Sequence, residues 1–577
     1  MYNDDRKRNN IIIFVLCLIM TAAVTFILGR KFSFVLSSND DVLLRSIASG
    51  NYTGKPEAHL IYIMYPLGLI FKGLYSVLPN VYWYDGIMTA LHMLCVFLIS
   101  FRMGWVFERL SNKIVGSVVS FGMMIMFDAM FIAEHQYTLL AGVCAATAIL
   151  WAATVKNKSN NAATNIIVIF LLLVSLWLRK QMFFLALPLL AMAIVFKIFD
   201  RKETVDERFE YFRDSLPPCI TFVVLVVLSF VIEAVAYSGD DWKAFKDYNE
   251  ARTEVYDYNK LPDFYDNPAF YLALGVSEDE YTALREYDVL LTKDIGTDEF
   301  TAFANQADEI DREWKQYYSV PRKVINETVN AMYGLNNSAL GLAVTLTFFV
   351  LLFFFLVKDD KFAGFLVLAS YAYEWLFVGY FTYLGRLPER ITHGFYMMEM
   401  CFLVAMFVIV IGKERPARQP SLFWQIVMSL FVVFILGTNG LNVARQALDS
   451  NLEAAGDADK WLEINAYFKS CPDNVYVLNT SVGASKPAYM FKEAASEAFN
   501  LVRAGNWAIS SPVESQHESR LLGRPVYEAL AKDDNVYYVM AIDKPVDWLE
   551  TAFGTVTLKD TITLSSGEEY GVYRLKK

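Results

Sequence analysis

Residues 11–28 read IIIFVLCLIMTAAVTFIL, and the stretch that follows at 37–45 reads SSNDDVLLR. The apolar run is long enough to cross a bilayer and has no small-residue cleavage site after it, so it predicts a first membrane span rather than a signal peptide. Three basic residues at 6–8 precede the run, and such flanks stay in the cytoplasm. Asp40 and Asp41 are therefore expected on the outer face, just above the hydrocarbon.

Two interpretations of this acidic pair remain open. Adjacent carboxylates at the start of a helix can supply a catalytic base. In the structural interpretation, Ser38 and Asp41 form a capping box, and acids in a first helical turn suit the helix dipole. Asp41 would then also form an i,i+4 ion pair with Arg45.

The composition places the chain among polytopic membrane proteins. Hydrophobic residues make up 55% of the 577 residues, and the mean hydropathy is +0.32. The formal net charge of −11 is concentrated in residues 237–333, which contain 21 Asp and Glu against 10 Lys and Arg. This acidic balance, without a basic and aromatic patch, argues against nucleic acid as a partner.

The topology depends on residues 60–78, which are apolar but interrupted by Pro66, Gly68, Lys72 and Gly73. If this segment crosses the membrane, the basic loops further along the chain fall outside. If it lies at the interface, they fall inside, as the positive-inside rule requires. We therefore expect residues 60–78 not to span.

The expected fold class is an α-helical polytopic membrane protein with a small α/β extracytoplasmic C-terminal domain. The N-terminus is then cytoplasmic, and the protein lies in the cell (plasma) membrane as a multi-pass chain. Eleven membrane-spanning helices are expected, at residues 11–28, 84–101, 114–132, 138–154, 162–178, 182–199, 220–236, 335–357, 362–379, 394–412 and 422–436.

Four parts follow from this topology. They are an N-terminal transmembrane catalytic module at 1–236 with a first outer loop at 30–83, a large acidic extracytoplasmic loop at 237–334, C-terminal transmembrane helices at 335–440, and an extracytoplasmic α/β domain at 454–577. Aromatic residues and carboxylates in the large loop suit a carbohydrate groove, although most of these aromatics are expected to pack the loop onto the membrane surface.

The C-terminal part alternates between strand and helix patterns. Such alternation is typical of a small, mostly parallel sheet. No glycine-rich phosphate loop accompanies it, which argues against a nucleotide site. The expected helices lie at 461–468, 486–503 and 526–532, the expected strands at 474–478 and 536–541, and a hairpin at 555–575.

Four features of the outer face place charges at or just above membrane depth. Charges near hydrocarbon are costly unless they are paired or useful. Each feature also has a plainer interpretation: a helix cap, a hydrated polar turn, side chains that extend to lipid headgroups, or ion pairing with Glu389. The features are the pair Asp40 and Asp41, the short turn with Asp128, Glu134 and His135, the apex with Arg179 and Lys180, and the loop with Arg386, Arg390 and His393.

Together these features resemble the GT-C superfamily of polyprenyl-phosphate-sugar glycosyltransferases, in particular its bacterial cell-envelope members. The resemblance rests on Asn39-Asp40-Asp41 in the first outer loop, a non-spanning helix after it, and a further acid in the second outer loop. The large outer loop and the soluble outer C-terminal domain also fit. The chain has no second Asp-x-Asp motif and no WWD-type signature, which argues against an oligosaccharyltransferase.

The resemblance implies transfer of a sugar from a polyprenyl-phosphate donor to an extracytoplasmic acceptor, which is a cell-wall polymer, a lipid-linked glycan or a protein. Membrane lipids would surround the donor chain. The implied roles are catalytic for Asp40, Asp41 and Glu134, donor-phosphate binding for Arg179, Lys180, Arg386 and Arg390, and auxiliary for Asp128, His135 and His393.

Two further expectations concern the donor phosphate. A divalent metal is optional, because a lipid monophosphate lacks the diphosphate that nucleotide-sugar enzymes must neutralise, and the sequence contains no Cys/His cluster that predicts a metal site. Arg386 and Arg390 are four residues apart, so on one helical turn both guanidinium groups would face the same way.

Alternative functions remain open at the level of sequence. A polysaccharide polymerase or ligase would share the substrates and the large outer loop. A lipid or glycan transporter would share the many spans and the intramembrane charges, but no inverted repeat is evident. A non-catalytic surface protein would use the soluble C-terminal part alone.

Overall fold

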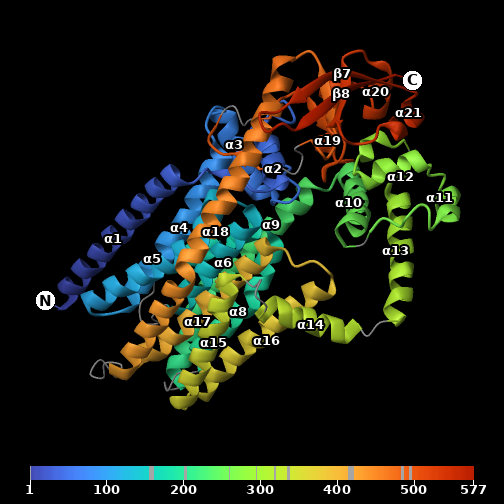
Figure 1. The fold of residues 1–577 in the computed structure, drawn as a ribbon. Helices are drawn as coiled ribbons and strands as arrows, with labels where there is room; N and C mark the ends of the chain where they lie inside the picture. The colour runs from blue at the N-terminus through green and yellow to red at the C-terminus, as the bar shows by residue number, and fades with distance from the viewer. Residues whose placement is uncertain are drawn as a thin grey trace.

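Long helices dominate the chain (Figure 1). The structure is a computed structural model that describes residues 2–154, 162–199, 205–258, 260–293, 295–317, 320–333, 338–413, 422–482, 487–492 and 497–576. Among these residues, eight helices are long and apolar enough to cross a membrane. They are α1 (Tyr2–Lys31), α4 (Trp83–Val106), α5 (Leu110–Ala133), α6 (Tyr137–Thr154), α9 (Val205–Ala236), α15 (Ala339–Val357), α16 (Lys361–Tyr383) and α17 (Glu389–Lys413).

The expectation of a polytopic helical fold is confirmed, whereas the expected number of eleven spans is not. The helices α7 (Ala162–Leu178) and α8 (Lys180–Phe199) lie at two further expected spans, but their apolar stretches are shorter. At the eleventh position α18 (Leu422–Ser470) is a single helix of 49 residues. At 1.5 Å per residue it is about 70 Å long, so it extends well beyond a bilayer toward the C-terminal domain (Figure 1).

Helix α6 forms the centre of the bundle and is buried along nearly its whole length. It packs against α4, α7, α8 and α17. A side chain at Gly142 would meet the Cα atom of Gly394 in α17 at 2.7 Å, so the two glycines allow α6 and α17 to approach closely. Small residues serve this purpose at helix crossings in membranes.

The segment expected as the first outer loop contains two short helices, α2 (Asn39–Ser49) and α3 (Tyr65–Val77). Helix α3 has 13 residues, which rise about 20 Å, less than the hydrocarbon thickness of about 30 Å. It packs against α2, α7 and α9. A helix of this length cannot cross the hydrocarbon, in agreement with the expectation for residues 60–78.

Residues 237–317 of the segment expected as the large outer loop, called the outer loop below, fold as a small helical unit with its own core. Its aromatic residues mainly pack against one another, so the expectation that most of them attach the loop to the membrane surface is wrong. The buried members include Tyr248, Tyr271, Tyr281, Phe300 and Phe303. The helices of this unit are α10 (Asp240–Thr253), η1 (Glu254–Tyr258), α11 (Pro268–Leu274), α12 (Glu278–Arg285), η2 (Val289–Leu291) and α13 (Thr297–Tyr317). Helix α14 (Val320–Tyr333) follows and packs against α16 instead.

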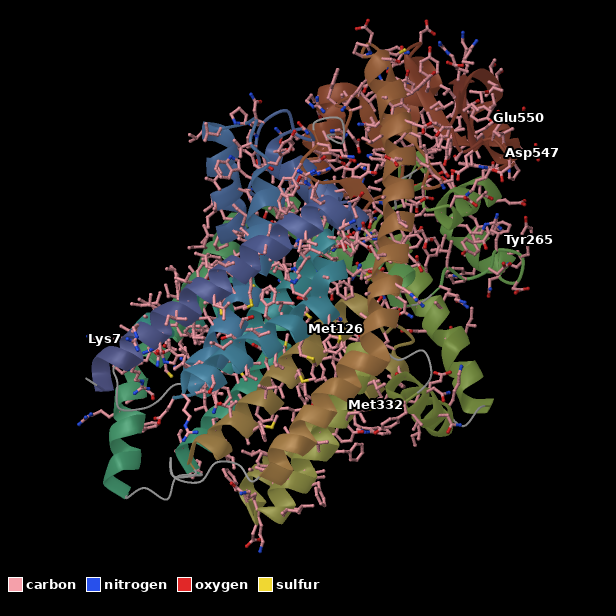
Figure 2. All side chains as sticks on the ribbon, turned by 60° about the vertical axis from the view of Figure 1, so that its left-hand side comes forward. Lys7, Met126, Tyr265, Met332, Asp547 and Glu550 are labelled. Atoms are coloured by element: carbon pink, nitrogen blue, oxygen red, sulfur yellow. The ribbon has the colours of Figure 1, made fainter. Side chains whose placement is uncertain are left out.

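The C-terminal part contains a five-stranded sheet in the order β5-β3-β6-β8-β7. Its three strands β5, β3 and β6 run parallel, and β8 and β7 form the expected antiparallel hairpin. Figure 2 shows Asp547 and Glu550 of this part at the opposite end of the molecule from Lys7. The elements are β3 (Val475–Leu478), β5 (Leu501–Arg503), α19 (Pro512–Leu521), α20 (Val526–Lys532), β6 (Val536–Ala541), α21 (Asp547–Phe553), β7 (Thr555–Thr563) and β8 (Glu569–Lys576).

The helix expected at residues 486–503 is wrong where the structure describes that segment. Residues Ala488–Tyr489 form strand β4, and β5 follows at 501–503, while residues 486 and 493–496 lie outside the described part. Strand β4 pairs with β1 (Val35–Leu36), which also pairs with β2 (Glu134–His135). Pairing with strands distant in sequence overrides the local helical propensity, which is a weak determinant.

Candidate active site

The small sheet β2-β1-β4 brings three distant segments together directly before α2. Helix α2 starts at Asn39, with Ser38 as its N-cap: the Ser38 hydroxyl accepts a hydrogen bond from the Asp41 amide at 3.3 Å. Asp40 and Asp41 therefore occupy the first turn, where carboxylates are stabilised by the helix dipole. The expected cap at Ser38 is confirmed.

The expected ion pair between Asp41 and Arg45 is wrong. The Nη1 atom of Arg45 lies 3.4 Å from Oδ2 of Asp85 in α4 and donates a hydrogen bond to the carbonyl of Tyr489 in β4 at 2.8 Å. The same Oδ2 atom of Asp85 accepts a hydrogen bond from the amide of Phe491 at 2.9 Å. Arg45 and Asp85 thus join α2 to the C-terminal part instead of stabilising α2 internally.

Asp41 is fully buried, and both of its carboxylate oxygens accept hydrogen bonds. Oδ2 accepts from the Ser38 hydroxyl at 2.7 Å, and Oδ1 accepts from the Tyr84 hydroxyl at 2.8 Å and from the Tyr137 amide at 3.2 Å. Burial raises the pKa of Asp41 to about 7, although these donors act in the opposite direction. With both oxygens in use, Asp41 is suited to anchor the first turn of α2.

Asp40 has a different environment. Its side chain is partly exposed, and no described residue makes a hydrogen bond or an ion pair with its carboxylate. Burial raises the pKa of Asp40, and the positive charges of Arg390, Arg179 and, more weakly, Arg386 lower it, while the negative charge of Asp257 raises it further. Asp40 is therefore a carboxylate close to more cations than acids, with oxygens available to accept a proton.

The three arginines near Asp40 lie in different parts of the chain and have different partners. Arg179, in the turn between α7 and α8, donates to the Tyr137 hydroxyl at 3.0 Å, and its guanidinium lies 5.3 Å from the ring centroid of Tyr62. Arg386, in the turn between α16 and α17, pairs with Asp257 of the outer loop at 2.8 Å. Arg390 lies in the first turn of α17 and forms no ion pair with the described residues.

The premise that Arg386 and Arg390 share one helical turn is wrong, because α17 begins at Glu389 and leaves Arg386 outside the helix. Lys180 is exposed, and its charge acts on Glu233 of α9 rather than belonging to the main charges around Asp40. Of the four cations predicted to bind phosphate, three therefore act on Asp40, and one of these three, Arg386, is already paired with Asp257.

The remaining predicted residues lie elsewhere. Glu134 is turned toward α18, where its Oε2 atom accepts a hydrogen bond from the Ser450 hydroxyl at 3.1 Å, and burial raises the pKa of Glu134. His135 is fully buried beside it in β2, and burial lowers the pKa of His135 to about 3. A neutral imidazole at this position takes no part in charge stabilisation.

Asp128 and His393 contact each other inside the bundle. Asp128 also contacts His92, which was not predicted from the sequence. Oδ2 of Asp128 lies 2.5 Å from Nε2 of His92 in α4, and Oδ1 lies 3.0 Å from Nε2 of His393 in α17. All three side chains are buried. They link α4, α5 and α17 within the helix bundle.

The sequence did not predict the aromatic and further basic side chains that lie near Asp40. The charge of Asp40 acts on the hydroxyl groups of Tyr62, Tyr137 and Tyr287. Arg252 of α10 donates to the Tyr287 hydroxyl at 2.5 Å. Tyrosines are abundant in this chain, so only the fold separates these three from the rest.

The C-terminal part also contributes to this group of side chains. The ring of Trp507 lies 4.6 Å from the ring of Tyr62, centroid to centroid. The surroundings of Asp40 therefore include residues from α2, the α7–α8 turn, the outer loop, the start of α17 and the C-terminal part. A carboxylate among several arginines and tyrosines can accept a proton while the cations bind a phosphate.

Comparisons with known proteins do not assign the chain to a family. No protein-family model matches the chain, and no curated protein matches it. Among the residues that the structure describes, no three or more His, Cys, Asp or Glu side chains are grouped so as to hold a metal ion.

Proposed function

We propose that this protein is a membrane glycosyltransferase of the GT-C type, which moves a sugar from a polyprenyl-phosphate donor to an extracytoplasmic acceptor of the cell envelope. The observation that carries the proposal is Asp40: an acid at a helix N-terminus, without a side-chain partner among the described residues, in the field of Arg179, Arg386 and Arg390. The eight long apolar helices would hold the protein in the membrane in which such a lipid-linked donor lies.

In the proposed reaction Asp40 removes the proton of the acceptor hydroxyl as its oxygen forms a bond to the anomeric carbon of the donor. The bond from that carbon to the phosphate oxygen breaks, and polyprenyl phosphate leaves with one more negative charge than it carried in the donor. Arg390 and Arg179 stabilise that charge where it develops. The leaving group is a weakly basic phosphate, so the mechanism needs no general acid.

The full topology belongs to this proposal. It has eleven spans, with α7, α8 and the first part of α18 in addition to the eight long apolar helices, and it places the N-terminus in the cytoplasm and the C-terminal domain outside. Under this topology Glu550 is reachable by a membrane-impermeant thiol reagent in intact cells after Glu550→Cys, whereas Lys7→Cys is not. Both variants are made in a chain whose six native cysteines are replaced by serine. The reverse labelling pattern would place Asp40 on the wrong face.

Arg390→Gln is expected to lower the rate of sugar transfer by about tenfold to a hundredfold with little change in protein level. The reason is that a charge-assisted contact to the leaving phosphate is strongest in the transition state, and Arg390 contributes no ion pair to folding among the described residues. The matched control is Arg285→Gln, an exposed arginine of α12, which should transfer at the normal rate. Equal rates for both variants would show that Arg390 does not hold the phosphate.

The pH dependence of transfer provides a second test. A base must be ionised, so the rate falls as the pH drops through the pKa of Asp40. Burial raises this pKa, so the acid limb should lie above the ordinary value of about 3.9 for Asp. Arg390→Gln removes the charge that lowers this pKa most and should move the acid limb to higher pH. An acid limb that stays in place in Arg390→Gln would exclude Asp40 as the group that titrates.

One observation favours a transporter as the second candidate. Glu374 of α16 and Glu399 of α17 are buried in the middle of two apolar helices and interact with each other. Acidic side chains at such depth are typical of proton-coupled carriers. Reconstituted into vesicles, a transporter would move polyprenyl-phosphate sugar between leaflets in a way that Glu374→Gln abolishes, whereas a transferase would convert the donor without moving it.

A further inference from the structure

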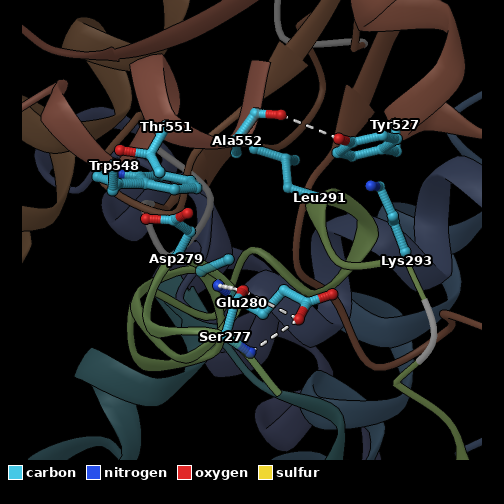
Figure 3. Close-up of a pocket in the computed structure, with 10 residues that line it drawn as sticks. Ser277, Asp279, Glu280, Leu291, Lys293, Tyr527, Trp548, Thr551 and Ala552 are labelled. Atoms are coloured by element: carbon cyan, nitrogen blue, oxygen red, sulfur yellow. Dashed lines mark hydrogen bonds between the residues drawn. The ribbon is translucent and has the colours of Figure 1, made fainter. Parts of the chain in front are cut away.

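A cavity of about 320 Å³ lies between the outer loop and the C-terminal part, apart from the Asp40 site (Figure 3). Helix α12 and the residues after it form one wall, with Asp279, Glu280 and Lys293. Helices α20 and α21 form the other wall, with Tyr527 and Trp548. A volume of this size is at the lower end of small-molecule sites.

The two walls of the cavity are fixed relative to each other because the outer loop packs against the C-terminal part. Ala283 and Leu291 of the outer loop belong to the same apolar core as the C-terminal sheet. Nearby, the buried carboxylate of Asp288 accepts hydrogen bonds from Asn479 at 2.6 Å and from the Tyr538 hydroxyl. The cavity is therefore preformed, which lowers the cost of binding.

The polar groups of the cavity include acceptors that the protein does not use. No described residue makes a side-chain hydrogen bond or ion pair with Asp279. In Glu280, Oε2 accepts from the amide and the hydroxyl of Ser277 at 3.0 Å each, as part of a capping box, and Oε1 makes no hydrogen bond or ion pair with the described residues. These oxygens can accept hydrogen bonds from hydroxyl groups of a ligand.

The aromatic groups complete the lining. Trp548 is half-buried, and Figure 3 shows its indole beside the carboxylate of Asp279. The Nζ atom of Lys293 lies 5.0 Å from the ring centroid of Tyr527, and the Tyr527 hydroxyl donates to the carbonyl of Ala552 at 3.0 Å. Tyr527 is thus fixed, while the indole of Trp548 offers a flat apolar surface next to unused acceptors.

This combination selects a class of ligand. A pyranose ring has a face of C–H groups that packs on an indole, and hydroxyl groups around its edge that donate to carboxylates. An acidic sugar or a phosphate would meet two carboxylates and one ammonium group, which is unfavourable. We propose that this cavity binds one neutral hexopyranose unit of a glycan, stacked on Trp548 and hydrogen-bonded to Asp279 and Glu280. Only the role of that glycan as acceptor rests on the proposed function; the binding itself does not.

The test uses the full chain in lipid nanodiscs and saturation-transfer NMR with three probes: cellotetraose, chitotetraose and the anionic tetragalacturonate. We expect transfer of saturation to at least one neutral tetrasaccharide and none to the anionic one. Trp548→Ala should weaken the binding by about tenfold. Tyr265→Ala is the matched control, because Tyr265 is an aromatic residue of the same loop, 67% exposed and outside the cavity, and this variant should bind normally.

Asp279→Asn tests the inference if Trp548→Ala fails to fold. Asp279 is a partly exposed residue in the first turn of α12, so its replacement should weaken binding without unfolding the protein. Absence of binding by both neutral probes, equal binding by the anionic probe, or normal binding by Asp279→Asn would each overturn the inference. The catalytic variant Asp40→Asn should bind like the wild type. Normal glycan binding by a wild-type protein that transfers no sugar would overturn the proposed function and leave this inference intact.

Discussion

Asp40→Asn is expected to lower the rate of sugar transfer by at least about a hundredfold, the usual scale of a general base. Asparagine has the same size, and Ser38 still caps the helix, so the first turn of α2 should persist. The measurement is release of polyprenyl phosphate from the polyprenyl-phosphate-sugar pool of the source cell by the purified protein. Thermal unfolding, followed in parallel, should show little change.

Asp41→Asn is the matched control for Asp40→Asn, and the two variants should differ in kind. Asp41 accepts hydrogen bonds from Ser38, Tyr84 and the Tyr137 amide. Asparagine keeps one acceptor oxygen and replaces the other by an NH₂ group, and each buried donor left without an acceptor costs about 1–3 kcal/mol. Asp41→Asn should therefore reduce stability clearly, and activity only as far as α2 is displaced. If Asp40→Asn is unstable and Asp41→Asn is inactive but stable, the two roles are assigned to the wrong residues.

Glu497→Ala is expected to destabilise the C-terminal part by about 3–5 kcal/mol, the range for breaking a buried ion pair, and to weaken its contact with α2. Glu497 pairs with Arg503, and both side chains are at most 6% exposed. Its Oε2 atom also accepts a hydrogen bond from the Ser46 hydroxyl of α2 at 2.5 Å. Removal of this carboxylate leaves the Arg503 charge buried and unpaired. Limited proteolysis and thermal unfolding of the full chain measure the effect.

Lys532→Ala provides the control for the Glu497 prediction. Lys532 pairs with Glu528 on the surface of α20, with side chains 59% and 49% exposed, and such pairs contribute less than about 1 kcal/mol. A normal protease sensitivity in Glu497→Ala would mean that the C-terminal part does not hold α2 in place. Asp40 would then be positioned by the membrane helices alone.

Much of the fold follows from patterns that are local in sequence. The long apolar runs predicted the positions of the helices, because no other local structure satisfies the backbone in hydrocarbon. Ser38 predicted the start of α2, since a cap depends only on residues three positions apart. The hairpin β7–β8 is local in the same sense. Strand β4 was missed because its partner β1 lies more than 450 residues earlier in the chain.

The acids and arginines of the candidate site could be predicted from the sequence, but their hydrogen-bond and ion-pair partners could not. Asp40 and Asp41 are adjacent in sequence, and only the buried hydroxyl of Tyr84 and the Tyr137 amide distinguish an anchored acid from an available one. The pairing of Arg386 with Asp257 depends on where the outer loop folds back. His92 was missed because a single histidine in an apolar helix gives no sequence signal before Asp128 is placed beside it.

The most direct test of the central claim is the cell-envelope glycan profile of a deletion strain that carries either the wild-type gene or the Asp40→Asn gene. Membrane levels of the two proteins are compared in the same cells. The account predicts that the deletion removes one sugar substituent from an envelope glycan, that the wild-type gene restores it, and that Asp40→Asn does not, at equal protein level. Full restoration by Asp40→Asn, or an unchanged glycan profile in the deletion strain, would contradict the account.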